Sequence, residues 1–183
     1  MIEGKKLIGF LNRYGFCLLT SRNDTLIKQQ GDYFSWDFRD LNQDGYKDIF
    51  LDMGGNIPER FDLLLYVPSM KTFKKIGNFD AYPDPKKIGG TKYYYSYHKS
   101  GCADANWDSD LFYIHNFKTI RLGNISGMEC GSRDEKDGLY ISRVRDKKKI
   151  LIRTLPIHTM SKYKDHKWGF IKEYWTKNYN LFL

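Results

Sequence analysis

The sequence contains little cysteine, and what it has does not form a metal-binding or redox motif. There are three cysteines, Cys17, Cys102 and Cys130, and no CxxC pair. This spacing argues against a zinc ribbon and against a thioredoxin-type site. Cys17 lies in the apolar stretch GFCLLTS, where we expect a small core residue. In an oxidising compartment Cys102 and Cys130 could form a disulfide, but the sequence does not decide whether their sulfurs meet.

The motifs of common enzymes are absent as well. The chain has no GxSxG, HExxH, GxGxxG or P-loop pattern. Its four histidines are widely spaced, and each is expected to be an ordinary surface or strand residue. We therefore predict no enzymatic activity and assign no catalytic residue.

Long apolar runs are also missing, which excludes a hydrophobic helix that crosses a bilayer. The first residues, MIEGKKLIGFLNRYGF, include lysines, but Gly9, Asn12 and Arg13 interrupt their apolar run. Such a start differs from a signal peptide. The sequence is compatible with a cytosolic protein and equally with an exported protein whose leader has been removed.

Acidic residues are in the minority, with 22 against 30 Lys and Arg, which gives a formal net charge of +8. A positive chain suits a polyanionic partner. The lysines, however, stand in short groups where turns and edge strands are expected, and lysine there keeps sheet edges soluble. No helix-turn-helix, zinc finger or RNP-like motif is present. We therefore expect no nucleic-acid partner.

Aromatic residues make up 16% of the 183 residues, and most of the chain alternates with a period of two. Strands are expected at 14–21, 25–30, 32–38, 47–53, 61–67, 72–77, 91–98, 109–116, 118–125, 138–145 and 148–156. The tail differs, because Trp168, Ile171, Trp175 and Tyr179 have helical spacing. The prediction is a single, mainly β domain over residues 1–183, an antiparallel propeller-like or sandwich fold with a short C-terminal helix.

One stretch, DLNQDGYKD, has the spacing of a cation-binding loop. Oxygen-bearing side chains alternate along it at Asp40, Asn42, Asp44 and Asp48. The glycine of this stretch allows a tight turn, and the backbone carbonyl of Tyr46 can add an oxygen. Three carboxylates with no nearby His or Cys favour Ca²⁺ over zinc, copper or iron. The alternative is a polar turn held by side-chain hydrogen bonds to the backbone.

The loop differs from the helix-loop-helix calcium hand. Its twelfth position is Leu51 where that motif needs a glutamate, and its flanks alternate like strands. It resembles instead the D-x-[DN]-x-D-G-x-x-D calcium loop of FG-GAP/VCBS repeats, over about residues 33–53. The resemblance implies that the side chains of Asp40, Asn42, Asp44 and Asp48 and the backbone of Tyr46 bind Ca²⁺.

The wider layout is similar to that of small bacterial periplasmic proteins, among them immunity proteins that inhibit peptidoglycan-cleaving enzymes. The shared features are a leading hairpin, the DxNxDG loop, the strand pair in FDLLLYVPSMKTFKKI and an aromatic tail. This likeness implies an extracytoplasmic, calcium-stabilised, non-enzymatic binding module with a protein partner such as a peptidoglycan hydrolase. The sequence alone leaves the compartment open.

Two alternative functions stay open at this point. A glycan-binding or adhesion module would use exposed aromatic residues, for which the candidates are Tyr93, Tyr95 and Trp107. An enzyme of unrecognised type would need acids gathered in a cleft. A second acidic stretch, DANWDSD at 104–110, lacks the glycine of the first, so we expect a polar loop capped by Trp107 there, and the sequence leaves open whether it binds metal.

Overall fold

The structure, a computed structural model, describes residues 6–55, 58–131 and 136–183. Its internal contacts divide the chain into two compact units, residues 1–81 (unit 1) and residues 82–183 (unit 2). Each unit is described here by itself. The prediction of one domain over residues 1–183 stays a prediction.

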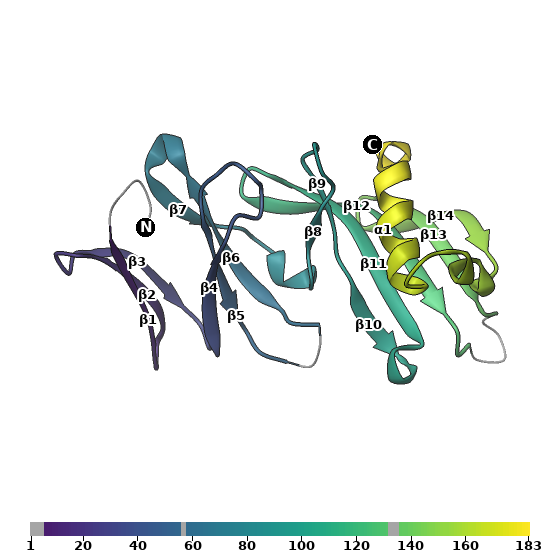
Figure 1. The fold of residues 1–183 in the computed structure, drawn as a ribbon, viewed down its shortest axis with the longest axis horizontal. Coiled ribbons are helices and arrows are strands. Elements are labelled where there is room, and N and C mark those ends of the chain that lie inside the picture. Colours follow the sequence, from purple (N-terminus) through teal and green to yellow (C-terminus); the bar gives the residue numbers. More distant parts are fainter. Residues whose placement is uncertain (1–5, 56–57, 132–135) are drawn as a thin grey trace. The chain divides into compact units, whose positions relative to one another are not determined.

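The predicted fold class is confirmed: the protein is mainly β, with three antiparallel sheets and a short C-terminal helix (Figure 1). The strands of unit 1 are β1 (Leu7–Asn12), β2 (Gly15–Thr20), β3 (Thr25–Gln30), β4 (Ser35–Arg39), β5 (Asp48–Asp52), β6 (Phe61–Val67) and β7 (Thr72–Lys75). The strands of unit 2 are β8 (Lys86–Lys87), β9 (Tyr93–Tyr95), β10 (His98–Gly101), β11 (Asn106–His115), β12 (Lys118–Met128), β13 (Gly138–Arg145) and β14 (Lys148–Leu155). None of the sheets closes into a barrel within the described residues.

Unit 1 contains two meanders, one of strands β1-β2-β3 and one of strands β4-β5-β6-β7. The sheets share a core of buried residues that come from both: Phe16, Leu18, Ile49, Leu51 and Leu64. Strand β1 approaches Trp36 of β4 so closely that a Cβ on Gly9 would lie 2.7 Å from the indole ring. The apolar residues that alternate along β2 and β5 therefore pack against each other between the two sheets.

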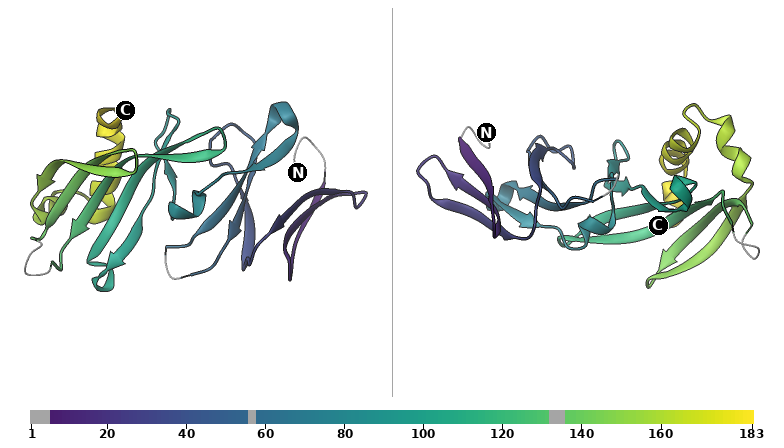
Figure 2. Two further views of the ribbon diagram at one scale, coloured as in Figure 1. Left: turned by 180° about the vertical axis from the view of Figure 1, so that it is seen from behind. Right: turned by 90° about the horizontal axis from the view of Figure 1, so that it is seen from below.

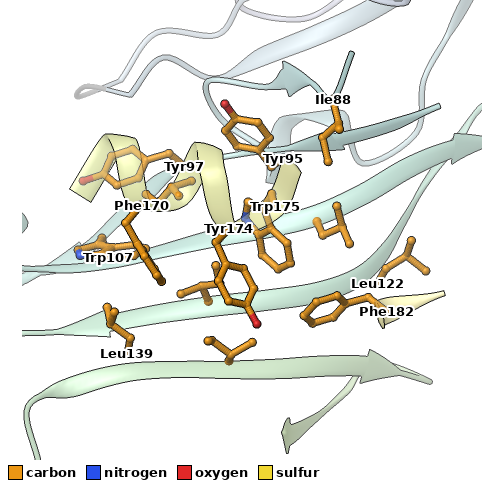
Figure 3. Packing of buried hydrophobic residues seen from close by; sticks show 14 of the residues in the cluster. Ile88, Tyr95, Tyr97, Trp107, Leu122, Leu139, Phe170, Tyr174, Trp175 and Phe182 are labelled. Atoms are coloured by element: carbon orange, nitrogen blue, oxygen red, sulfur yellow. The ribbon is translucent and has the colours of Figure 1, made fainter. Parts of the chain in front are cut away.

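Unit 2 is built on one sheet with the order β14-β13-β12-β11-β9-β8, and β10 pairs with β11. Helix α1 (Lys167–Asn178) covers one face of this sheet (Figure 2). Its buried side chains, Phe170, Ile171, Tyr174 and Trp175, pack against sheet residues that include Trp107 and Leu139 (Figure 3). Burying each of these large side chains contributes about 1.5–3 kcal/mol, so this packing fixes the helix on the sheet.

A hydrogen-bond chain fixes the position of the buried indole at the centre of this core. Trp175 Nε1 donates to Ser109 Oγ at 2.8 Å, and Ser109 Oγ donates to the carbonyl of Ser96 at 2.6 Å. Trp175 and both serines are 0% exposed, so these polar atoms need partners inside the protein. The chain supplies them and thereby fixes the rotation of α1 against β11.

The structure corrects three local predictions. The helical spacing places Trp168 on one face with Ile171 and Trp175, but Trp168 is 46% exposed, because Phe170 and Tyr174 share the buried face with those two residues. Strand β1 lies in the stretch whose apolar run is interrupted by Gly9 and Asn12 and for which no strand was expected. Residues 106–108, expected in a polar loop, begin strand β11.

Cys102 and Cys130 form a disulfide that spans 28 residues, and Cys17 is a buried free thiol. The bond joins the short 3₁₀ turn Cys102–Asp104 to the segment that follows β12. It settles the pairing that the sequence left open. A structural disulfide is typical of proteins in oxidising compartments.

Replacing both bridging cysteines by serine should lower the free energy of unfolding by about 3–4 kcal/mol, because the unfolded chain regains the entropy of a 28-residue loop. Chemical denaturation of the oxidised protein and of the Cys102→Ser/Cys130→Ser variant measures this difference. Reductant should destabilise the original protein and leave the variant unchanged. Equal stability of the original protein with and without reductant would contradict the expectation.

Candidate metal centre

The predicted cation loop closes the hairpin between β4 and β5. The two strands pair antiparallel, with Arg39 opposite Asp48. The chain turns through Gln43 and Gly45, whose φ angles are 58° and 90°. Positive φ costs glycine little, so Gly45 is the residue that permits this turn.

Side chains at the first, third and fifth positions of the loop bind its own backbone. Asp40 Oδ1 and Oδ2 accept the N–H groups of Asp44 and Gly45 at 3.1 and 3.0 Å. Asn42 Nδ2 donates to Asp44 Oδ2 at 2.8 Å, and Asp44 Oδ1 accepts the N–H of Tyr46 at 2.9 Å. These are the hydrogen bonds of the polar-turn interpretation, and they preorganise the loop.

Asp48 is the buried member of the loop. It is 0% exposed, and its two oxygens accept the N–H groups of Leu41 and Tyr66, each at 3.0 Å. Burial raises the pKa of Asp48 from its ordinary 3.8 to about 6; the two N–H groups oppose this rise, and the charges of Asp44 and Asp40 add to it. The fold therefore holds a carboxylate in a place where ionisation is unfavourable.

The donor set of the loop fits a hard cation. Among the described residues, the ion pairs with Lys, Arg or His involve none of the three loop carboxylates, Asp40, Asp44 and Asp48. A carboxylate oxygen that accepts one N–H keeps a further lone pair, so these hydrogen bonds do not exhaust the ligands. In the described part of the chain, no three His, Cys, Asp or Glu side chains converge closely enough to hold an ion. The loop oxygens are of the kind that Ca²⁺ prefers, but in this structure they bind N–H groups of the loop and do not converge on one point.

The aromatic candidates for a glycan surface lie mostly inside unit 2. Trp107 is 0% exposed and Tyr95 is 8% exposed, and both belong to the core beneath α1 (Figure 3). These two rings therefore do not offer the exposed surface that a glycan-binding module would need, because the period-two pattern does not say which face of a strand is covered. Tyr93 is half-buried and packs against Tyr113 and Tyr179.

The second acidic stretch contributes to a polar network that sequence reasoning missed. Asp108 and Asp110 both accept from Asn124 Nδ2, at 3.0 and 2.8 Å, and Arg121 also pairs with Asp110. Burial opposes ionisation of Asp108, but hydrogen bonds from Ser126 and Asn124 outweigh it and lower its pKa. The alternation of the two aspartates along β11 was the available signal, since it places both on the face of the sheet opposite α1.

The comparisons with known proteins give little beyond this geometry. A scan against protein-family models gives no match, and a search of curated proteins finds no match. A search of solved structures finds a protein described as "Structure of a Xanthomonas Type IV Secretion System related protein". That chain is 15% identical with a TM-score of 0.49, and the match covers 75% of this chain and 69% of the other. A likeness this distant carries no argument about function.

Within the described residues, no helix has the length and apolar character needed to span a bilayer.

The raised pKa of Asp48 predicts a pH dependence of the calcium-free protein. Its folded-state pKa of about 6 exceeds the ordinary 3.8, so the folded protein binds the proton more tightly than the unfolded chain. This contribution to stability is therefore complete at low pH and is lost as pH rises through about 6. Over that range it amounts to at most about 3 kcal/mol.

Urea unfolding in chelator, from about pH 4 to about pH 7, checks this when the protein is compared with the Asp48→Asn variant. The asparagine side chain does not titrate. It has one acceptor oxygen where aspartate has two, so the variant should differ in free energy of unfolding by an amount that does not change with pH. We expect the original protein to lose stability relative to the variant as pH rises. Parallel curves would show that Asp48 titrates as it does in the unfolded chain.

Proposed function

We propose that this chain is a calcium-stabilised, non-enzymatic binding module of the bacterial cell envelope. The observation that carries the proposal is the buried carboxylate of Asp48, which stands near Asp40 and Asp44 without a basic side chain as partner among the described residues. A divalent cation at this loop would compensate three negative charges at once. The ligands would be the side-chain oxygens of Asp40, Asn42, Asp44 and Asp48 and the carbonyl of Tyr46.

The expected energetic effect suits a structural ion. Extracellular calcium modules bind with dissociation constants of about 10⁻⁴–10⁻³ M, and tenfold excess of the ion then adds about 1.4 kcal/mol of stability. Asp48 already connects the loop to the N–H of Tyr66 on β6. An ion bound at the loop would therefore stabilise the sheet β4-β5-β6-β7. A loop whose oxygens all come from the protein offers no obvious open position for a substrate.

The disulfide supports the envelope as the compartment. Disulfides form and persist in oxidising environments, the bacterial periplasm among them. The Cys102–Cys130 bond is thus what an exported protein of this size is expected to have. The layout shared with periplasmic immunity proteins adds the proposal of a protein partner, a peptidoglycan hydrolase that this module binds and inhibits.

Asp44→Ala tests the metal part of the proposal. The variant should melt at a lower temperature than the original protein in millimolar Ca²⁺, by several degrees, and the difference should be clearly smaller in excess chelator, where only the hydrogen bonds of Asp44 with Asn42 and Tyr46 are lost. Magnesium should not replace calcium, because it prefers a smaller octahedral site with bound waters. Thermal unfolding followed by circular dichroism gives all of these values.

Asp32→Ala is the matched control, since Asp32 is an exposed aspartate of unit 1 outside the loop. It should melt like the original protein with and without calcium. If Asp44→Ala lost the same stability in calcium and in chelator, the loop would be a hydrogen-bonded turn, and the metal proposal would fail.

The partner is tested by the rate at which a purified lysozyme-type hydrolase cleaves isolated peptidoglycan. Adding the calcium-loaded protein at a molar excess should slow this cleavage, because a module that blocks the active site competes with the substrate. The Asp44→Ala protein at a temperature above its melting point should not inhibit. Unchanged cleavage with folded, calcium-loaded protein would remove this class of partner.

A further inference from the structure

Unit 2 contains a groove that the calcium loop does not explain. It has a volume of about 290 Å³ and lies where the first turns of α1 meet the segment from Asp84 to Tyr97. Three aromatic side chains, Tyr95, Tyr97 and Trp168, line it. Binding sites for small molecules begin at about this volume, so the groove suits a ligand of one or two rings.

Trp168 is the exposed aromatic residue of this groove. Trp168 is 46% exposed, although Phe170 and Ile171, which follow it on α1, are buried. Tyr97 holds it from one side, with ring centroids 4.2 Å apart and an edge-to-face angle of 63°. The ammonium of Lys167 lies 5.0 Å from the centroid of the same indole. The ring is therefore fixed in place while nearly half of the side chain remains open to a ligand.

The support behind Trp168 is rigid as well. Lys167 Nζ donates to Tyr97 Oη at 2.9 Å and forms an ion pair with Asp104 at 3.1 Å. Tyr97 Oη also donates to Asp104, and burial together with this bond raises the pKa of Tyr97. The adjacent disulfide at Cys102 anchors the turn that contains Asp104. A side chain held this way loses little entropy when a ligand stacks on it.

The polar groups of the groove are balanced in charge. Two carboxylates, Asp84 and Asp165, and two ammonium groups, Lys86 and Lys172, line it. Asp84 pairs with Lys86 at 3.2 Å, while Asp165 and Lys172 take part in none of the ion pairs of the described residues. The groove therefore has no net preference for an anion or a cation. It offers donors and acceptors to a neutral ligand with many hydroxyl groups.

From these features we propose that the groove of Tyr95, Tyr97, Trp168, Asp165 and Lys172 binds a neutral saccharide. The apolar C–H face of a sugar ring stacks on the open side of Trp168, because the face of an aromatic ring carries negative charge density and attracts polarised C–H groups. Sugar hydroxyls donate to the carboxylate of Asp165 and accept from the ammonium of Lys172. Tyr95 and Tyr97 add apolar lining to the groove.

This site is separate from the proposed calcium function. All of its residues belong to unit 2, and the calcium loop belongs to unit 1. Saccharide binding should therefore survive both chelator and the Asp44→Ala substitution. Failure of one proposal leaves the other intact.

Isothermal titration with N,N′-diacetylchitobiose, cellobiose and maltose as probes tests the proposal on the full disulfide-bonded chain. At least one probe should bind in a saturable manner. Trp168→Ala should weaken that binding about tenfold or more, since it removes the stacking surface. Trp168→Phe, which keeps a ring, should restore most of the affinity, and Asp165→Asn should weaken binding less than Trp168→Ala does.

Phe117→Ala is the matched control, because Phe117 is an aromatic residue of unit 2 that is 39% exposed and does not line the groove. It should bind like the original protein. In NMR spectra, the indole N–H signal that disappears in Trp168→Phe should shift on adding the probe, and those of the other three tryptophans should not. The proposal is overturned if no probe binds, or if Trp168→Ala binds with unchanged affinity in a protein that melts normally.

Discussion

The carboxylate of Asp48 is the constraint on which the second sheet of unit 1 depends. Its oxygens accept N–H groups from the loop at Leu41 and from β6 at Tyr66, so one side chain joins three consecutive parts of the fold. A buried carboxylate that lost these donors would destabilise the fold by more than an ordinary hydrogen bond contributes. The same burial makes ionisation of Asp48 unfavourable. In the proposed function, a bound cation would offset this cost. Asp48 thus stabilises the fold and is also a ligand in the proposed calcium site.

The interior of unit 2 is organised differently, around aromatic packing and a neutral hydrogen-bond chain. Trp175 enters the core of the sheet, and its indole N–H is satisfied through Ser109 and the carbonyl of Ser96. This arrangement sets the helix so that Phe170 and Ile171 point inward and Trp168 is left at the surface. Tyr97 and Lys167 hold this exposed indole in place. The saccharide proposal gives that position a role.

Several of the basic side chains form ion pairs inside the two units. Several lysines are committed to local ion pairs, such as Lys75 with the buried Asp62 and Lys149 with Asp108. The charge of each of these lysines is balanced locally by its aspartate partner. The positive net charge by itself therefore does not define a polyanion site.

The sequence by itself determined most of the strands, the terminal helix and the position of the oxygen-rich loop, because alternation, turn residues and the DxNxDG spacing are local signals. It could not determine which face of a strand or helix is covered. Trp107 and Tyr95, the candidates for an exposed glycan surface, are buried, and Trp168, which shares helical spacing with Ile171 and Trp175, is exposed, since burial depends on which element packs there. Only the tertiary structure decided that Cys102 meets Cys130, that Asp108 and Asp110 share Asn124, and that Trp168 borders a groove. Each of these facts joins residues that are distant in the chain, and a local pattern contains no information about that distance.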